Sequence, residues 1–324
     1  MNAVRPRVAL TLGDPAGVGP ELAARLLARP ESLRAADVYV LADAAEIDDA
    51  ARRAGVAVPL AAKPSEAAAA LLDDASAPDR AIEIGVVSQA AGARALHQLR
   101  RALALVRDGR VDAIVFSPLN KASAHLGGMR QEDELRWFAG EFGVTGVTSE
   151  LNVVDRLWTA RVTSHISIAQ VPARITVERT VGTIGLLHSM LSASGVATPR
   201  IAVAALNPHA GENGRFGREE IDVIAPAVRM AAAYGIDVRG PFPADTVFIA
   251  AHRGDYDGVV TMYHDQGQIA MKLLGFDRGV TVQGGLPVPV VTPAHGTAFD
   301  IVGKGLADAG ATFHAFDLAV ALAS

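Results

Sequence analysis

The chain has 324 residues, half of them hydrophobic (50%), and carries a formal net charge of −5 at pH 7. This length is sufficient for two domains, or one large one, with a substantial core. No apolar run approaches the roughly 20 residues that span a bilayer, and no basic stripe with interleaved aromatic residues is present. We therefore expect neither a membrane nor a nucleic acid as a partner. The first residues lack the pattern of a signal peptide, which predicts a cytoplasmic protein.

Cysteine is absent from the sequence. Disulfides, thiolate nucleophiles and cysteine metal ligands are therefore excluded. Any transition-metal site must be built from histidine and carboxylate side chains.

The first motif is a predicted strand at Val8–Leu12 that leads into the glycine-rich turn of Thr11–Glu21. Its glycines, at 13, 17 and 19, do not fit the G-x-G-x-x-G fingerprint, and no Gly-Lys-Ser/Thr follows them. Neither a Rossmann fingerprint nor a P-loop is thus present. A tight turn with Pro20 at the first helical position is the simpler interpretation.

Helical and strand-like segments alternate from residue 21 to about residue 110, which is typical of an α/β protein with a mostly parallel sheet. These segments are Leu22–Ala28, Val38–Leu41, Ala44–Ala54, Ala67–Leu72, Ile82–Val87 and Ala90–Val106. A buried strand is predicted at Val111–Phe116. Lys121 follows it, and either contact with a ligand or exposure in a solvated loop would explain that lysine.

The central part of the chain continues this alternation. A helix is predicted from Gln131, where Glu132, Asp133 and Glu134 suit the positive end of its dipole. Residues 146–176 are rich in β-formers, 177–195 and 219–234 are predicted helices, and 201–206 is a predicted strand. A rigid turn at 240–246 presents Asp245, and a last helix closes the chain.

The stretch Thr261–Lys272 has the strongest pattern of a functional site. A β-branched run ends at Thr261, and His264 and Asp265 follow it immediately. Ligands of open α/β sheets bind outside the carboxyl ends of the strands. An isolated histidine there would more often be a satisfied core residue. However, His165 and His209 also follow apolar, β-rich runs, and this recurrence favours a site.

Six motifs together resemble the 4-hydroxythreonine-4-phosphate dehydrogenase family of vitamin B6 biosynthesis. They occur in family order and cover nearly the whole chain. The motifs are Gly13–Glu21, Ser117–Lys121, Asn207–Glu212, Gly240–Asp245, Tyr263–Gly267 and His295–Asp300.

The resemblance implies a two-domain α/β fold similar to the isocitrate and isopropylmalate dehydrogenases, with the active site in the interdomain cleft. We expect one domain to comprise residues 1–126 plus 296–324, and the other to comprise 127–295 with the metal histidines and the dimer interface. The family uses NAD, with NADP as an alternative, and its members are homodimers. Residues 295–305 also resemble the adenosine-binding loop of isopropylmalate dehydrogenases, so the missing Rossmann fingerprint does not exclude NAD.

Family roles can be transferred to individual residues. The resemblance implies a divalent metal shared across the dimer interface, with Zn²⁺ first and Co²⁺, Ni²⁺, Mn²⁺ or Mg²⁺ as alternatives; its ligands are His165, His209 and His264. It implies a catalytic group of Lys272, Asp245 and Asp265, in which the two acids orient imidazoles and the lysine serves acid–base chemistry. The expected cofactor-binding residues are His295, Gly296, Thr297, Ala298 and Asp300. The expected substrate-binding residues are Lys121, Gln131, Glu132, Asp133 and Thr281.

The sequence departs from the family where the substrate is bound. The family's Gly-His-Thr-Glu is replaced by the run Arg130–Glu134, and Thr281 and Val290 stand where the family has Asn and Arg. Loss of the arginine removes a bidentate partner for phosphate. We therefore expect an unphosphorylated hydroxy acid or vicinal diol as the small-molecule substrate, oxidised with or without decarboxylation.

Other functions fit parts of the pattern. One is a true 4-hydroxythreonine-4-phosphate dehydrogenase in pyridoxal phosphate synthesis. Another is a metal-dependent hydrolase or lyase without a nucleotide, against which the intact 295–305 segment argues. A third is a metal- or metabolite-binding protein without catalysis, which the retained Lys272 and Asp265 disfavour.

Overall fold

The computed structural model describes residues 5–77 and 82–324. The protein divides into two compact units, one formed by Met1–Val144 with Leu286–Ser324 and the other by Thr145–Gly285. The sequence placed these boundaries at 126/127 and 295/296. Residues 127–144 and 286–295 belong instead to the first unit, because Trp137 and Phe138 are buried in its core and residues 290–291 pair with its central strands.

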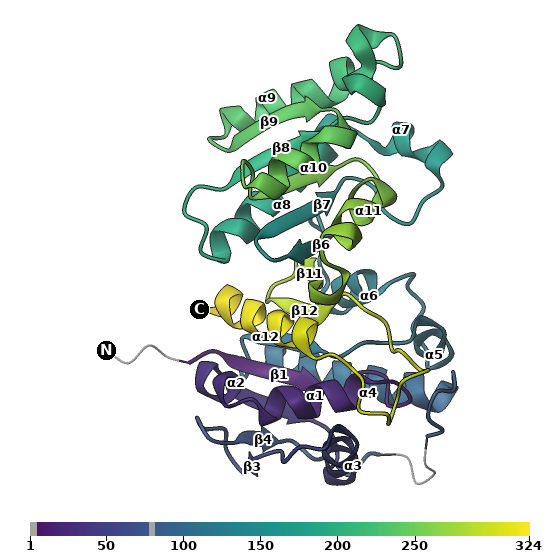
Figure 1. Ribbon diagram of the computed structural model, residues 1–324, viewed down its shortest axis with the longest axis vertical. Helices are drawn as coiled ribbons and strands as arrows, with labels where there is room; N and C mark the ends of the chain where they lie inside the picture. Colours follow the sequence, from purple (N-terminus) through teal and green to yellow (C-terminus); the bar gives the residue numbers. More distant parts are fainter. Residues whose placement is uncertain (1–4, 78–81) are drawn as a thin grey trace. The chain divides into compact units, whose positions relative to one another are not determined.

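The first unit is built on a parallel sheet (Figure 1). Its strands, in spatial order, are β3 (Leu60–Ala61), β4 (Ala69–Leu71), β2 (Asp37–Leu41), β1 (Arg7–Thr11), β5 (Ala113–Phe116) and β12 (Val290–Pro293). The chain leaves β1 towards β2 on one side and later returns to β5 on the other. The topological switch point of this sheet therefore lies between β1 and β5.

Helices cover both faces of this sheet. Figure 1 shows α1 and α12 in front of it and α4 behind it. Ile114 and Phe116 of β5 pack with α4 and α6 in one apolar cluster, while α1 packs with the start of α12 in another. The helices of this unit are α1 (Gly19–Ala28), α2 (Pro30–Ala35), α3 (Ala44–Ala54), α4 (Gln89–Arg107), α5 (Lys121–Leu126), α6 (Glu134–Phe142) and α12 (Gly310–Ala323).

The second unit contains a mixed sheet. Its strands, in spatial order, are β11 (Val280–Gly284), β6 (Ser149–Val154), β7 (Leu157–Arg161), β10 (Gly258–Thr261), β8 (Arg200–Ala204) and β9 (Asp237–Phe242). The β11–β6 and β6–β7 pairs are antiparallel, whereas β7, β10, β8 and β9 run parallel to one another. The carboxyl ends of these four neighbouring strands therefore meet at one edge of the sheet.

Successive residues of β10 show which helices cover each face of the second sheet. A Cβ at Gly258 would lie 2.8 Å from the Leu187 side chain of α8, whereas Val259 packs with α10 and α11. The helices of this unit are α7 (Val171–Arg174), α8 (Val177–Ala193), α9 (Ala225–Ala233), α10 (Ala244–Arg253) and α11 (His264–Gly275). Its shorter helical turns are η1 (Ile168–Gln170), η2 (Pro208–Gly214), η3 (Glu220–Ile224) and η4 (Phe276–Arg278).

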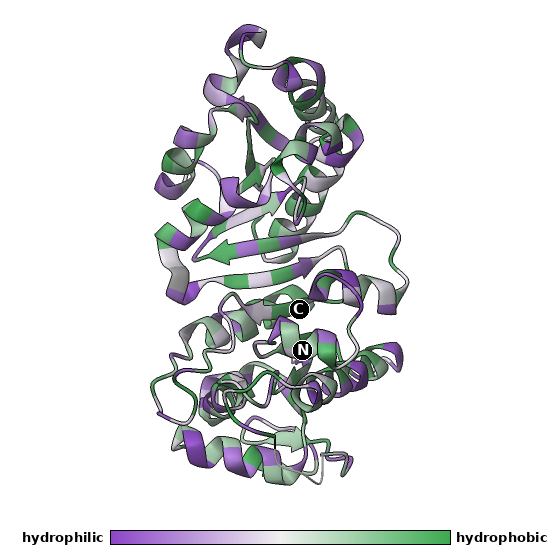
Figure 2. Ribbon diagram, turned by 90° about the vertical axis from the view of Figure 1, so that its right-hand side faces the viewer, coloured by the Kyte–Doolittle hydropathy of each residue, from purple (hydrophilic) through white to green (hydrophobic). Residues whose placement is uncertain are grey.

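The α/β class predicted from the sequence is confirmed. Figure 2 shows that the helices combine hydrophilic and hydrophobic residues, as helices with one buried face require. One of the alternating segments is a strand despite its alanine content, and another has no regular structure. The alanine-rich run around residue 70 forms strand β4, because it pairs with β2, and Ile82–Val87 forms neither helix nor strand. No helix in the described residues is long and apolar enough to span a bilayer.

Gly92 permits a close approach between α4 and the neighbouring α5. A Cβ built at Gly92 would lie 1.6 Å from the carbonyl oxygen of Ser123, which is far inside van der Waals contact. We predict that Gly92→Ala destabilises the protein by roughly 1–3 kcal/mol, because two helix backbones must move apart. The change is measured as the shift of the thermal unfolding midpoint.

Gly185→Ala is the matched control, because Gly185 also lies inside a helix but has no atom within 4 Å of the position that a Cβ would take. That substitution is expected to stabilise by about 0.5–1 kcal/mol through helix propensity. Equal stability of the two variants would contradict the close-packing argument.

Candidate functional site

Three histidines follow three neighbouring parallel strands of the second unit. His165 comes four residues after the end of β7, His264 begins α11 after β10, and His209 follows β8. These strands lie in the order β7, β10, β8 and run in the same direction. The three segments therefore leave from the same edge of the sheet, where α/β proteins bind their ligands.

His165 and His264 lie close together. Their ring centroids are 5.7 Å apart, and both line a pocket whose wall also includes Thr163, Tyr263 and Asp265. The Nδ1 atom of His264 lies 2.7 Å from Oδ1 of Asp265. A carboxylate on one ring nitrogen fixes the orientation of the imidazole and leaves the other nitrogen, Nε2, for a metal ion.

His209 lies in an unusual backbone segment. Five consecutive residues of η2, from His209 to Asn213, have positive φ angles between 41° and 77°. Left-handed backbone costs about 1–2 kcal/mol for each residue that is not glycine. His165 also has a positive φ, of 38°. Strained residues of this kind persist where surrounding contacts hold them, and they cluster at functional sites.

The three histidines are not gathered into one cluster by a single chain. All three are described residues, yet their ring nitrogens do not all come within 4.8 Å of one another. The structure thus brings His165 and His264 together and places His209 on the same sheet edge. The expectation that two subunits complete this set stays a prediction.

The other residues expected in the second unit lie around the same elements. Asp245 is exposed in the first turn of α10, which follows the parallel strand β9, and Lys272 is exposed on α11. Thr281 lies on β11, where its Oγ1 accepts a hydrogen bond of 3.2 Å from Asn152. Asn152 also accepts hydrogen bonds from Gln268 (2.7 Å) and the buried Arg161 (3.0 Å).

The substrate-binding candidates of the first unit mostly have local structural roles. Asp133 is the N-cap of α6 and accepts a 2.7 Å hydrogen bond from the Arg136 N–H, and Glu132 pairs with the Arg136 side chain at 3.0 Å. The side chain of Gln131 accepts a bond from the Arg130 N–H (3.2 Å). Lys121 is exposed as the first residue of α5. Helix capping therefore accounts for part of the acidic run.

Val290 is fully buried on β12 within the apolar cluster that includes Ile114 and Phe116. A side chain in this position packs and presents no group to a ligand. Position 290 therefore supplies no partner for a phosphate group.

The segment 295–305 is fastened to the N-terminal turn and α1. The Val18 N–H donates to the Thr297 carbonyl (3.0 Å), and the Gly303 N–H donates to Glu21, which is fully buried (2.6 Å). Ala298 has a φ of 44°, and Asp300 is exposed. The Nε2 atom of His295 is buried and has no hydrogen-bond partner among the described residues. A buried nitrogen without a partner, in a loop that also contains Gly296 and Gly303, is compatible with a nucleotide-binding loop.

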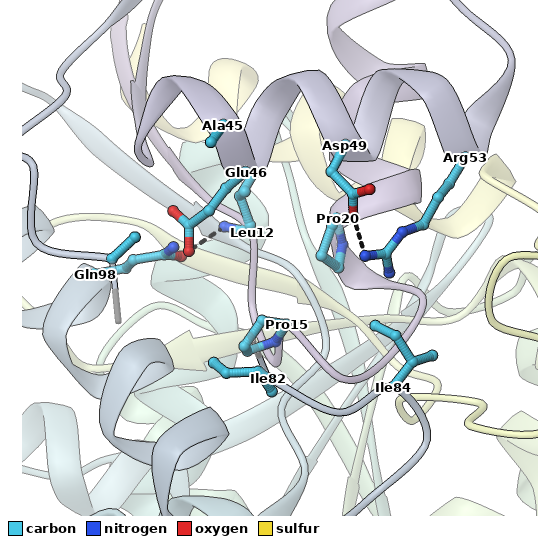
Figure 3. A pocket seen from close by; sticks show the side chains of 11 residues that line it. Leu12, Pro15, Pro20, Ala45, Glu46, Asp49, Arg53, Ile82, Ile84 and Gln98 are labelled. Carbon is cyan, nitrogen blue, oxygen red and sulfur yellow. Dashed lines mark hydrogen bonds and ion pairs between the residues drawn. The ribbon is translucent and has the colours of Figure 1, made fainter. Parts of the chain in front are cut away.

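A separate pocket lies beside the N-terminal turn, between it and α3 (Figure 3). Its walls are mostly apolar, and its charged groups are already paired: Asp49 with Arg53, and Glu46 with Arg94. None of the residues predicted from the sequence lines it. We therefore assign it no part in the candidate site.

Sequence reasoning missed three buried acids near these loops, Asp14, Glu21 and Glu220. Asp14 lies in the turn after β1, at the switch point, where its own N–H donates to the Pro118 carbonyl (3.0 Å). Burial raises the pKa of Asp14, and a hydrogen bond from the Ala16 N–H partly offsets this effect. An acid inside an otherwise glycine-, proline- and alanine-rich stretch is the signal that would have identified Asp14 and Glu21.

Solved structures resemble this protein over its whole length. A 4-hydroxythreonine-4-phosphate dehydrogenase from Klebsiella pneumoniae matches with a TM-score of 0.85 and 38% identity, covering 100% of this chain and 99% of that one. A β-decarboxylating dehydrogenase from Thermococcus kodakarensis matches with a TM-score of 0.52 and 16% identity, covering 96% and 81%. The second likeness concerns the fold alone.

Curated relatives also align along nearly the entire chain. A Pseudomonas aeruginosa protein provisionally named 4-hydroxythreonine-4-phosphate dehydrogenase 2 is 51% identical over 330 residues, covering 98% of both chains. A D-threonate 4-phosphate dehydrogenase from Cupriavidus necator is 40% identical over 315 residues, covering 95% of this chain and 94% of that one. The family model described as pyridoxal phosphate biosynthetic protein PdxA matches residues 33–319. The chain belongs to this PdxA family, as its six sequence motifs predicted.

Proposed function

We propose that this protein is a dehydrogenase that uses NAD and a divalent metal to oxidise a CH–OH group of a phosphorylated hydroxy acid. The observation that carries the proposal is the placement of His165, His264 and His209 after three adjacent parallel strands. The names of the relatives support the oxidoreductase class. A hydrolase or lyase without nucleotide is disfavoured by the fastened 295–305 loop.

Neutral imidazoles are suitable ligands for a catalytic Zn²⁺, and Co²⁺, Ni²⁺, Mn²⁺ or Mg²⁺ are the alternatives. The three histidines would hold the ion, which would act as a Lewis acid on the substrate oxygens. Asp265 holds the His264 ring through Nδ1, so the Nε2 atom of His264 faces away from the Asp265 carboxylate. Asp245 is proposed to serve a second ligand imidazole in the same way. Lys272, exposed two turns after His264, is proposed to move the proton of the reacting hydroxyl.

The nucleotide is proposed to bind at His295, Gly296, Thr297, Ala298 and Asp300. NAD would accept a hydride there, and NADP is the alternative. The buried Nε2 of His295 supplies a polar contact, and the exposed Asp300 supplies a carboxylate for a ribose hydroxyl. The Glu21 carboxylate and the Val18 N–H keep the loop against α1 through the two hydrogen bonds described above.

The proposed substrate class replaces the sequence expectation of an unphosphorylated acid or diol. That expectation rested on Val290, Thr281 and the acids at 132–134. Asp133 and Glu132 are engaged at the start of α6, so their repulsion of a phosphate is weaker than the sequence alone indicates. The relatives at 51% and 40% identity are named for substrates with a 4-phosphate. If the oxidised carbon lies β to the carboxylate, loss of CO₂ follows from the chemistry of β-keto acids.

We further propose a homodimer in which the second copy completes the metal site. Apolar side chains are exposed on the segments that carry His165 and His264: Ile166 by 38% and Ile168 by 66% after His165, and Ile269 by 62% and Leu273 by 83% on α11. A contiguous exposed apolar patch marks a surface that another protein covers, and we propose that these side chains form such a patch. Since one chain does not gather all three histidines, a second copy on this face would supply the missing ligand.

Replacement of any one of the three histidines by Ala is expected to remove most of the bound metal. The loss of metal affinity should exceed the roughly 10–100-fold that follows when only an orienting partner is removed. Metal content is measured by inductively coupled plasma mass spectrometry, and folding by circular dichroism. His252→Ala is the control, because His252 is exposed in the last turn of α10. A triple variant that keeps its metal and activity would refute the site.

Leu273→Asp is expected to convert the dimer into a monomer, because it places a charge in the proposed apolar interface. An interface of this kind should bury on the order of 2,000 Å². Light scattering after size exclusion gives the mass. Tyr234→Asp is the control, since Tyr234 is also exposed (72%) but follows α9, at the start of β9 and hence at the opposite sheet edge. An active wild-type monomer at assay concentration would contradict the proposal.

The phosphorylated hydroxy acid is expected to have the higher kcat/KM. Each charge-assisted hydrogen bond to phosphate contributes roughly 1.5–3 kcal/mol, which corresponds to about 10–150-fold. The comparison uses D-threonate 4-phosphate and 4-hydroxythreonine 4-phosphate against their unphosphorylated forms and a cis-dihydrodiol. Lys121→Ala should raise KM only for the phosphorylated compounds, and the exposed Lys63→Ala should not. Faster turnover of an unphosphorylated substrate would restore the original expectation.

A further inference from the structure

The left-handed turn that carries His209 requires stabilising contacts from outside the turn. Residues 209–213 all adopt positive φ, although only Gly211 is a glycine. Within the turn, the Phe216 N–H donates to the Gly211 carbonyl and the Arg215 N–H donates to the Glu212 carbonyl, at 3.1 and 3.2 Å. These local bonds also exist in an ordinary turn, so they do not explain why this conformation is selected.

Glu220 supplies contacts that stabilise this conformation of the turn. Its Oε1 accepts hydrogen bonds from the backbone N–H groups of Leu206 (2.9 Å) and Asn207 (2.7 Å), and its Oε2 accepts one from the Asn207 side chain (3.0 Å). The residue is only 3% exposed. A Cβ on Gly211 would lie 2.6 Å from Oε2, so the carboxyl group also lies directly against the turn.

We infer that Glu220 is a positioning residue for His209, and through it for the metal ion; this inference rests on the proposed function. The carboxyl group binds the chain where it leaves β8, two and three residues before His209, and touches it again at Gly211, two residues after. The imidazole is therefore held from both sides. Glu220 opens the π-helical turn η3, and insertions of this kind are common at functional sites.

All three hydrogen bonds to Glu220 come from N–H donors, which explains an acid at this position. Glutamine in its place would keep an oxygen for the two backbone N–H groups of residues 206 and 207. Its amide nitrogen would then face the Asn207 side-chain nitrogen, donor against donor. Glu220→Gln is thus a graded variant between the wild type and Glu220→Ala.

The test measures Zn²⁺ affinity of the full-length protein by calorimetry with a competing chelator. We expect Glu220→Ala to bind Zn²⁺ about 10–100-fold more weakly, and Glu220→Gln to lie between it and the wild type. Asp222→Asn is the matched control, because Asp222 lies two residues on, is exposed and pairs only with Arg218 among the described residues. Hydrogen exchange of residues 206–217 in metal-free protein should rise in Glu220→Ala.

A double-mutant cycle separates positioning from a general structural role. If Glu220 acts through His209, its removal should not weaken Zn²⁺ binding further in a His209→Ala background. Equal weakening in both backgrounds would overturn the inference, as would unchanged affinity of Glu220→Ala. If Glu220→Ala does not fold, the same cycle with Glu220→Gln decides. If His209→Ala alone binds Zn²⁺ as tightly as the wild type, the proposed metal site itself is wrong.

Discussion

The parallel alignment of β7, β10, β8 and β9 is the constraint on which the rest of the second unit depends. Parallel pairing sends every carboxyl end to the same edge, so the segments carrying His165, His264, His209 and Asp245 all leave there. The antiparallel β6 and β11 extend the sheet beyond β7 without adding a histidine to that edge. A one-residue shift in the register of one strand would turn its side chains to the opposite face of the sheet.

Each unit stabilises an irregular loop with a buried glutamate. In the first, Glu21 accepts a hydrogen bond from the Gly303 N–H of the 295–305 segment. In the second, Glu220 accepts hydrogen bonds from the N–H groups of Leu206 and Asn207. A loop of irregular backbone leaves N–H groups without partners, and a carboxylate can satisfy two or more of them at once. Burial of a carboxylate costs free energy, and the hydrogen bonds that set the loop conformation also offset this cost.

Much of the fold follows from local signals. The helix predicted at Ala44–Ala54 is found with those bounds, because Asp43 and Glu46 form a capping box and Gly55 ends the helix in the left-handed conformation. The three histidines are recognisable in the sequence because each follows a β-rich run. Non-local contacts explain the failures. Pairing with β2 makes a strand of an alanine-rich run, and pairing of β12 with β5 moves the domain boundary.

Individual roles in the site were harder to predict than its location. The sequence predicts Asp133 both at the start of a helix and as a substrate contact, and its capping bond to the Arg136 N–H accounts for the first role. No sequence pattern points to Glu220, because its partners lie 13 and 14 residues earlier in the chain. Sequence patterns identify residues that follow strands, but they do not show which buried acid holds which loop.

Exposure at the sheet edge that carries His165, His264 and His209 connects the proposed metal site with the proposed dimer. His165 is exposed, and Ile168 and Leu273 present apolar surface to water nearby. Electrostatic and Lewis-acid effects are strongest where water is excluded. On the proposed dimer, the partner would cover this surface and contribute a ligand in the same step. Metal binding and association would then be linked, because an ion held by two copies stabilises their complex, and the stabilising free energy increases as the affinity for the ion increases. The strained conformations of His165 and His209 are consistent with such a site, in which the fold of each copy orients its own ligands before the partner arrives.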